Sequence, residues 1–317
     1  MRRWQRWLIA AALLGATALG VLAWRPQLAL DAEFARLRWL AGASVHDVDA
    51  ANHHWRYLEA GSGPVVVLVH GFTGSKENWL PIIGALSRHY RVLAPDLPGW
   101  GESERRSDGR YGFVEQAGHL DAFLAATAGQ ADVRVVGHSM GGGIAALWAA
   151  SQPAALRQLV LMDAAGVPFD NDFSRRVRAG EHPFEVLDEA TLQRQFALVF
   201  DRPPFAPWPA TTALARMRAA QVDFERSVLR SIAGDESLAF APGDAASRIA
   251  VPTLLAWCRD DRVIDASAAA VYAERIAHTE TVWFDGCSHM PMMEQPAATS
   301  DALLTFFAQP DKATAAH

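Results

Sequence analysis

Short apolar runs alternate with helical stretches along most of this chain, and no other feature limits the possible folds as strongly. Val65–Val69 is one such run, and its valines are typical of a strand that is buried on both faces of a sheet. Comparable runs occupy Arg91–Pro95, Val133–Gly137, Gln158–Met162, Val251–Trp257 and Thr281–Phe284, after two shorter strand patterns at Val45–Asp49 and His53–Leu58. Helical patterns lie between them, at Glu77–Arg88, Gly112–Ala126, Met140–Ala150, Ser267–Ala277 and Pro296–Phe307. This order predicts an α/β fold with a mostly parallel, doubly wound sheet.

The alternation is interrupted once, between the strand that ends at Met162 and the strand that begins at Val251. The intervening residues contain helical patterns at Gln193–Phe200 and Thr211–Arg230 and a proline-rich loop at Asp201–Pro209. We interpret residues 166–248 as a helical lid inserted after the sixth strand, so that residues 44–165 and 249–310 form the core. The length of 317 residues would suit two domains, but the interruption favours one domain with its own lid.

The first 24 residues have the pattern of a membrane segment. Three arginines within the first six residues precede the uncharged run Leu8–Ala23, and tryptophans stand at both of its edges. From Trp7 to Trp24 a helix would be about 27 Å long, close to the roughly 30 Å of a bilayer's hydrocarbon core. The segment is interpreted either as a retained membrane anchor or as a signal peptide that is cleaved after secretion. Both interpretations place the catalytic part on the periplasmic or extracytoplasmic side, because the arginines stay inside.

Residues 25–43 predict a connector helix. Leu30, Phe34 and Leu37 recur at helical spacing, with arginines elsewhere on the helix. This helix either packs on the globular part or lies along the lipid surface, and the sequence leaves both arrangements open.

The first chemical signal is Gly137-His138-Ser139-Met140-Gly141, between a buried strand and a helix. A Gly-x-Ser-x-Gly pattern in that context predicts a nucleophile elbow, in which a sharp turn projects the serine above the carboxyl ends of the strands. Gly137 and Gly141 are small because bulky neighbours would clash in such a turn. Ser139 is therefore the candidate nucleophile, and the alternative is a serine that only caps the helix.

A nucleophilic serine requires a base and an acid that orients it. His289 follows the last predicted strand, which places it at the same sheet edge as the elbow. Asp261 is the preferred acid, because it follows the strand Val251–Trp257 and precedes an apolar pair. Asp260 and Asp265 compete with it, as a solvated neighbour and a helix cap respectively. Asp163, at the end of an earlier strand, is a further candidate.

An oxyanion hole needs two backbone N–H donors. The N–H of Met140, directly after the nucleophile, is the first candidate. The second is the N–H of Phe72, in the loop His70–Ser75 after the first buried strand, where the small Gly71 lets the backbone turn toward the site.

Taken in order, these motifs resemble the α/β-hydrolase family. The matching pieces are His70-Gly71-Phe72, Asp96–Ser103, the elbow, the Trp257–Asp265 loop, and His289 followed by Glu294-Gln295-Pro296. The N-terminal apolar segment and the stretch His70–Trp79 resemble those of membrane-associated monoacylglycerol-lipase-like enzymes and related bacterial lipases. In two places the chain departs from the family pattern, with Cys258 and Ser288 standing where glycines are usual.

Cys258 and Cys287 are the only two cysteines, and they lie on the loops that carry the acid and the base. In an oxidising periplasm they would pair and brace these loops, whereas two neighbouring thiols are also ordinary packing.

The composition excludes other classes of protein. A net charge of −6, with no basic block beyond the first six residues, argues against nucleic-acid binding. Two cysteines exclude a four-cysteine zinc site, and no His-Glu-x-x-His or comparable spacing indicates another metal site. We therefore expect neither a metal nor a cofactor.

The predicted function is a serine hydrolase that cleaves carboxylic esters through an acyl-enzyme. The predicted lid carries many aromatic residues, and an aromatic lid suits an acyl chain, which favours acylglycerols or other lipid esters. These residues are Phe169, Phe173, Phe184, Phe196, Phe200, Phe205, Trp208, Phe224 and Phe240. A carbon–carbon bond hydrolase or a cofactor-free haloperoxidase would use the same triad, and a non-catalytic binding module is the alternative of a different class. The sequence does not indicate the oligomeric state.

Overall fold

A computed structural model describes residues 2–204 and 208–309 of the chain. Within these residues eight strands form one sheet in the order β1-β2-β4-β3-β5-β6-β7-β8. The strands are β1 (Ser44–Ala50), β2 (His53–Ala60), β3 (Val65–Val69), β4 (Arg91–Pro95), β5 (Val133–His138), β6 (Leu156–Met162), β7 (Thr253–Cys258) and β8 (Thr279–Phe284). Strand β2 is antiparallel to β1 and β4, and the other pairs are parallel. The predicted α/β fold with a mostly parallel sheet is confirmed.

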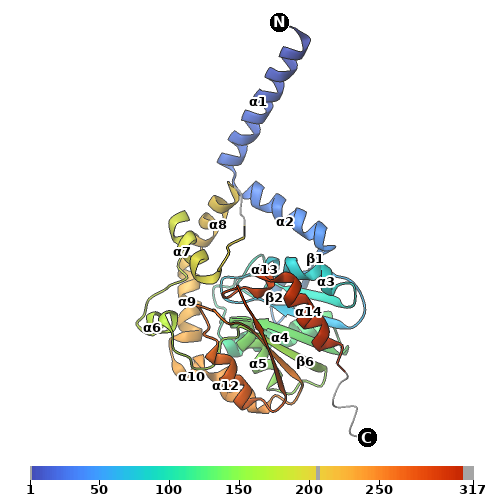
Figure 1. Cartoon of the computed structure of the whole chain (residues 1–317), viewed down its shortest axis with the longest axis vertical. Coiled ribbons are helices and arrows are strands. Elements are labelled where there is room, and N and C mark those ends of the chain that lie inside the picture. The colour runs from blue at the N-terminus through green and yellow to red at the C-terminus, as the bar shows by residue number, and fades with distance from the viewer. Residues whose placement is uncertain (1, 205–207, 310–317) are drawn as a thin grey trace.

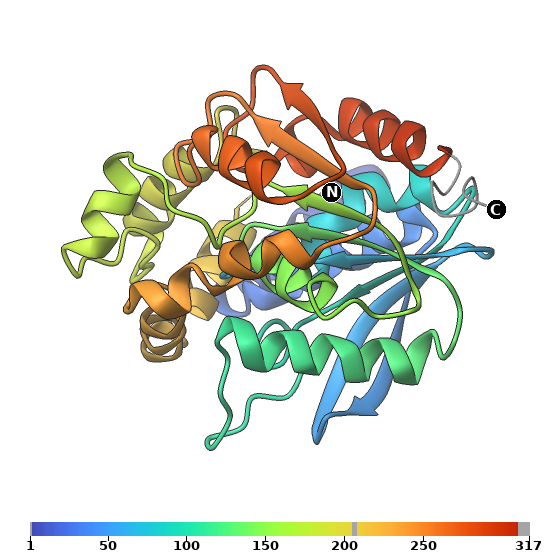
Figure 2. The same cartoon turned by 90° about the horizontal axis from the view of Figure 1, so that it is seen from below.

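Helices cover both faces of this sheet (Figure 2). The core helices are α3 (Leu80–Leu86), α4 (Phe113–Thr127), α5 (Met140–Ala149), α12 (Ser267–Arg275), α13 (Pro291–Glu294) and α14 (Pro296–Phe307). Strand β3 shows why the sheet is covered twice. Val65, Val67 and Val69 belong to one buried apolar cluster, whereas Val66 and Leu68 belong to the other, because successive side chains of a strand point to opposite faces.

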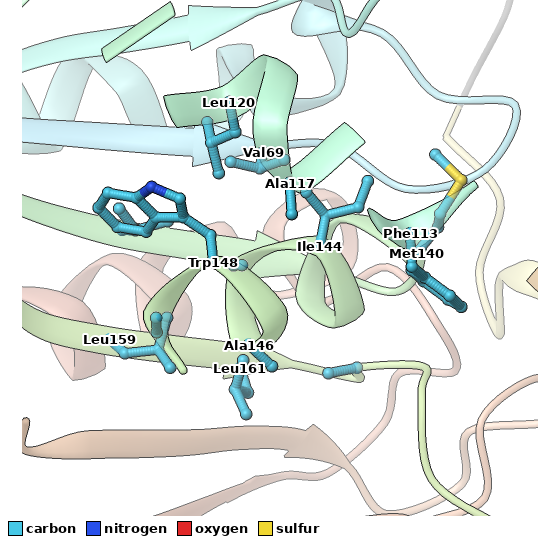
Figure 3. Packing of buried hydrophobic residues seen from close by; sticks show 14 of the residues in the cluster. Val69, Phe113, Ala117, Leu120, Met140, Ile144, Ala146, Trp148, Leu159 and Leu161 are labelled. Carbon is cyan, nitrogen blue, oxygen red and sulfur yellow. The ribbon is translucent and has the colours of Figure 1, made fainter. Parts of the chain in front are cut away.

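Helix α5 is central to the first cluster. Figure 3 shows its Ile144 and Trp148 packed among Val69 of β3, Leu120 of α4 and Leu159 of β6. These side chains are buried, and each contributes roughly 1.5–3 kcal/mol by leaving water. The helix that starts at the elbow is therefore held rigidly from two sides.

Two helices differ from the predicted ones. The pattern at Glu77–Arg88 begins as the 3-10 helix Lys76–Trp79 and continues as α3, with Pro81 in the first turn of α3. The pattern at Thr211–Arg230 is split into α8 (Ala210–Ala219) and α9 (Val222–Ala233). Ala220 and Gln221 form the turn between them, so the helical stretch expected there consists of two helices.

The insertion after the sixth strand is confirmed as helical, and we call residues 166–248 the inserted segment. Its elements are α6 (Asp172–Arg178), α7 (Glu189–Val199), α8, α9, α10 (Glu236–Ala239), α11 (Ala241–Ala245) and the 3-10 helix Ala246–Arg248. They gather at one end of the sheet (Figure 2). Phe205, one of the aromatic residues noted in the sequence, and residue 310, the predicted end of the core, lie outside the described residues.

The N-terminal helix α1 (Arg3–Trp24) stands apart from the globular part (Figure 1). Among the described residues it is the one helix long and apolar enough to cross a membrane, with a mean hydropathy of 2.0 over its most apolar window and no part of that window buried. The next helix, α2 (Gln27–Ala41), packs one face on the globular part. Its Leu30 contacts Ala210 and Ala213 of α8, and its Ala41 joins the second apolar cluster.

Candidate active site

The strand register brings the candidate residues to one edge of the sheet. Pairs at the carboxyl ends of β5, β6, β7 and β8 include His138 with Met162 and Cys258 with Phe284. Ser139, Asp163, Asp261 and His289 all follow these ends. Segments far apart in the sequence therefore meet here, as ligand sites in open α/β sheets generally do.

Ser139 occupies the sharp turn between β5 and α5. Its backbone φ of 53° and ψ of −122° are unusual for a residue with a side chain. The turn has room only for glycine at the positions two residues before and two residues after Ser139. A Cβ on Gly137 would lie 2.3 Å from the carbonyl oxygen of Gly141, and a Cβ on Gly141 would lie 2.3 Å from that of Val69. The local geometry is that of the elbow predicted from the sequence.

His289 and Asp261 are joined by a hydrogen bond. The distance between Nδ1 of His289 and Oδ2 of Asp261 is 2.8 Å, and both side chains are buried. Burial lowers the pKa of His289 below its ordinary value, so the resting imidazole is neutral, as a general base must be. Within the described residues the Ser139 hydroxyl makes no hydrogen bond to this ring, whose Nδ1 is bonded to Asp261.

The three competing aspartates occupy different environments. Oδ1 of Asp261 accepts the N–H groups of Val263 and Ile264 at 2.7 and 3.0 Å, which fixes the carboxylate toward His289. Asp260 is exposed. Asp265 accepts the N–H of Ser267 at the start of α12, as expected of a helix cap. Asp163 accepts the Cys258 N–H, whereas the histidine is bonded to Asp261.

The candidate oxyanion loop, residues 70–75, lies against the elbow. A Cβ on Gly71 would lie 2.8 Å from Cβ of Ser139, so the loop backbone passes as close to the serine as glycine allows. Among the described residues neither Phe72 N–H nor Met140 N–H donates to a protein acceptor. His70 stabilises the loop, because its Nδ1 lies 2.8 Å from the Gly71 carbonyl oxygen and its Nε2 accepts the Leu97 N–H.

Ser139 and Met140 line a pocket that opens to solvent. Its lining is mostly apolar and rich in phenylalanine: Phe72, Phe113, Phe169, Phe173, Phe184 and Phe240. Four of these belong to the inserted segment. The other aromatics of that segment have different surroundings. Phe224 packs on Trp100 and Tyr111, Phe196 packs on Phe200, and Trp208 is exposed.

The end of helix α7 contacts both loops of the candidate triad, a contact that the sequence did not reveal. The backbone carbonyl of Val199 accepts the His289 N–H at 2.9 Å, and the carbonyl of Phe200 accepts from the Arg262 guanidinium at 2.6 Å. Glu294 completes the junction. Its Oε1 accepts the N–H groups of residues 201 and 202, and its Oε2 accepts the Ser288 N–H. The inserted segment is thus part of the scaffold that positions His289.

Replacing Glu294 with glutamine is expected to disturb this junction, because an amide NH₂ would face a backbone N–H. Loss of hydrogen bonds to a charged acceptor predicts a decrease of about 1.5–3 kcal/mol in the free energy of unfolding. Thermal unfolding and ester-hydrolysis kinetics check this, with the exposed Glu274→Gln as control. Equal melting temperatures for both variants would contradict the assigned role.

Cys258 and Cys287 form a disulfide that links the ends of β7 and β8, with Cα atoms 5.6 Å apart and both residues buried. The double variant Cys258→Ser/Cys287→Ser is expected to lose about 2–4 kcal/mol of stability, because the bond closes a loop of 29 residues. Its kcat should also fall, since the acid and base loops would lose their link. Mass measurement of the unreduced chain tests the bond itself, and two alkylatable thiols without reductant would contradict it.

Behind the oxyanion loop lies a buried group of charges. Nζ of Lys76 is 2.7 Å from Asp96 and 2.6 Å from Glu102, and Lys76 is 1% exposed. Glu77 accepts from Arg38 of α2, so the connector helix reaches this group. Burial alone would lower the pKa of Lys76, but the carboxylates of Asp96 and Glu77 raise it above the ordinary value, and the ammonium stays charged.

Comparison with known proteins identifies the family of the chain. A model of the alpha/beta hydrolase fold matches residues 64–296, most of the chain, and the protein belongs to this family. This membership confirms the resemblance drawn from the motifs.

Several individual proteins are similar to the chain. Lipase 1 of Psychrobacter immobilis is 27% identical over 255 residues, which cover 79% of each chain. Monoacylglycerol lipase ABHD6 of Mus musculus is 24% identical over 265 residues, with 78% of this chain and 76% of that protein covered. A 2-hydroxy-6-oxo-6-(2'-aminophenyl)hexa-2,4-dienoic acid hydrolase of Metapseudomonas resinovorans is 30% identical over 275 residues, with 83% and 90% covered. A solved structure of a bacterial membrane phospholipase A has a TM-score of 0.85 and 33% identity, and the match covers 96% of this chain and 98% of that one.

Proposed function

We propose that the protein is a membrane-anchored serine hydrolase that cleaves carboxylic esters of lipids through an acyl-enzyme. The observation that carries the proposal is the position of Ser139. It lies in the lining of a phenylalanine-rich pocket, beside two backbone N–H groups that have no acceptor in the part of the chain that the structure describes. Relatives named lipase and monoacylglycerol lipase support ester hydrolysis.

In this mechanism His289 takes the proton of the Ser139 hydroxyl as the oxygen attacks the ester carbonyl. Asp261 holds Nδ1 of the histidine and stabilises the imidazolium that forms. The N–H groups of Phe72 and Met140 bind the oxyanion, a contribution of about 2.7–4 kcal/mol for each donor. His289 then protonates the leaving alcohol, and afterwards it activates the water that releases the fatty acid.

The pocket supports an acyl chain as the group that is bound. Six phenylalanines line it, and its charged neighbours, Arg178 and Glu236, are exposed. Burial of methylene groups against such a lining contributes about 0.8 kcal/mol each. The hydrolase therefore gains specificity from chain length, and the alcohol part of the ester faces the opening.

The N-terminal helices support attachment to a membrane. Helix α1 would cross the bilayer. Helix α2 would lie along the bilayer surface, and the face of α2 that does not pack on the protein would contact the lipid. On that side Leu28, Trp39 and Leu40 are 50%, 78% and 58% exposed, and such side chains favour the interfacial region. The catalytic part then lies on the extracytoplasmic side. If the segment is instead a cleaved signal, the N-terminal sequence of the mature protein would begin after it.

The proposal is tested with nitrophenyl esters of increasing chain length, monoacylglycerols and phospholipid vesicles. We expect kcat/KM to rise with acyl length until the pocket is filled, and hydrolysis of at least one lipid ester well above the Ser139→Ala background. The absence of any hydrolysis above that background would defeat the esterase assignment. A preference for acetyl esters would defeat the lipid assignment alone.

Carbon–carbon bond hydrolysis is the second candidate, because the relative from Metapseudomonas resinovorans is named as a hydrolase of a substituted hexadienoic acid. A dienoate substrate brings a carboxylate, which needs a cation in the pocket. Arg178 is the only cationic side chain among the described lining residues, and it is paired with Asp170 at the exposed rim. Cleavage of a vinylogous 1,5-diketone faster than any ester would favour this second function.

A further inference from the structure

Asp163, directly after β6, is a buried carboxyl group that the proposed mechanism does not use. Its Oδ1 accepts the Cys258 N–H at 2.9 Å. Its Oδ2 is buried and has no hydrogen-bond partner among the described residues. The backbone φ of 44° lies in the left-handed region, which residues other than glycine rarely occupy. The position is thus strained and incompletely bonded, and both properties are common where a residue has a functional role.

Asp163 lies beside the loop that carries Asp261. Strands β6 and β7 are neighbours, with Met162 opposite Ala256, so the residues beyond their ends meet. Both residues bond to Cys258, because Oδ1 of Asp163 accepts its N–H and its carbonyl oxygen accepts the Asp261 N–H at 3.3 Å. A carboxylate has about four acceptor positions. Asp261 uses three of them, for Val263, Ile264 and His289, and one is left.

Two buried carboxyl groups in contact do not both ionise, because like charges repel strongly where water is excluded. The donors decide which one keeps the proton. Asp261 receives three hydrogen bonds and is stabilised as the anion, whereas Asp163 receives one. Burial and the adjacent Asp261 raise the pKa of Asp163 well above its usual range.

We propose that Asp163 is a positioning residue that stays protonated at neutral pH and donates a hydrogen bond from Oδ2 to the Asp261 carboxylate. The proton fills the fourth acceptor position of Asp261 and supplies the missing partner of Oδ2. Asp261 is then held on all sides, so its Oδ2 stays directed at Nδ1 of His289. This inference rests on the proposed roles of Asp261 and His289.

Infrared spectroscopy of the detergent-solubilised full chain tests the proton directly. At neutral pH the wild type should show the carbonyl band of a protonated carboxylic acid, and Asp163→Asn should lack that band. Asp260→Asn, which alters an exposed neighbour, should keep it. A band that persists in Asp163→Asn, or is missing from the wild type, would overturn the proposal. This measurement needs no enzymatic activity, so it is independent of the proposed function.

The pH profile of kcat/KM gives a second test in the same protein. The titratable groups facing Asp163 and Asp261 are His289, Asp265 and Glu294. The variant Asp163→Asn replaces a protonated carboxyl donor with an amide donor, and both are neutral. The acid limb of the profile should therefore not move, and kcat should stay within about threefold. Alanine removes the donor and concentrates charge on Asp261. The acid limb should therefore move to higher pH, and kcat should fall about 10-fold or more.

The opposite assignment predicts a different shift. If Asp163 were ionised, its replacement by asparagine would remove a negative charge near His289. The imidazolium would lose stabilisation, and the acid limb would move to lower pH. That shift would overturn the proposal even if the alanine variant failed to fold.

Discussion

Ser139→Ala is expected to lower kcat for ester hydrolysis by about 10⁵- to 10⁶-fold, because it removes the oxygen that forms the acyl-enzyme. KM should change little, since the pocket lining and the oxyanion donors are retained. A residual rate of about 10³-fold over the uncatalysed reaction is expected from binding and the oxyanion hole alone. Steady-state kinetics on the best nitrophenyl ester measures the loss.

The matched control is Ser300→Ala, which removes another buried serine hydroxyl, bonded to the Pro296 carbonyl on α14. It should leave kcat within about twofold, because it lies away from the elbow. A fluorophosphonate probe should add one adduct to the wild type and to Ser300→Ala, and none to Ser139→Ala. Retention of more than about 1% of wild-type activity by Ser139→Ala would refute a serine nucleophile at this position.

Lys76→Met is expected to cause the largest loss of stability, about 3–5 kcal/mol. The methionine fills a similar volume but leaves the fully buried Asp96 carboxylate without its cation. Burying an unpaired charge is costly, whereas the wild-type group is close to balanced: its cations are Lys76, Arg38 and Arg56, and its carboxylates are Asp96, Glu77 and Glu102. The melting temperature in detergent should fall by roughly 2–4 °C for each kcal/mol lost.

Arg36→Met is the control for this variant. Arg36 lies on the same helix as Arg38, and it forms an exposed ion pair with Glu33. Exposed pairs contribute little to stability, so its melting temperature should match that of the wild type. If both variants unfold at the same temperature, the charge group behind the oxyanion loop has no structural importance. A fall in kcat for Lys76→Met at temperatures where it is folded would show that this group also positions the loop.

The features that depend on local geometry could be predicted from the sequence. The strand Val65–Val69 and the elbow at Ser139 depend on neighbours within a few residues. The residue types in the local sequence therefore indicate their steric requirements. A Cβ at Gly137 or Gly141 has no room. The Gly-x-Ser-x-Gly pattern therefore predicts the turn. The preference for Asp261 over Asp260 and Asp265 also followed from position relative to a strand end, and the hydrogen bond to His289 agrees with it.

The contacts of Asp163, Glu294 and helix α7 were not predictable in the same way. Cys258 N–H donates to a carboxylate 95 positions earlier in the chain, and Glu294 accepts from backbone 93 positions before it. Such contacts depend on which strands become neighbours and on how the inserted segment returns to the sheet. No local pattern encodes either. The sequence ranked Asp163 as a competing acid, whereas the fold places it beside the preferred acid.

The sequence by itself therefore determined the α/β-hydrolase fold, the positions of the candidate serine, histidine and acid, and an N-terminal segment apolar enough for a membrane. These features follow from hydrophobic periodicity and from steric limits that act over a few residues. Only the tertiary structure decided that α2 packs on the protein with one face, that four of the insert's phenylalanines reach the pocket, and that Asp163 meets Asp261. The physical reason is that burial and unpaired hydrogen-bonding groups depend on surroundings that segments distant in the sequence supply together.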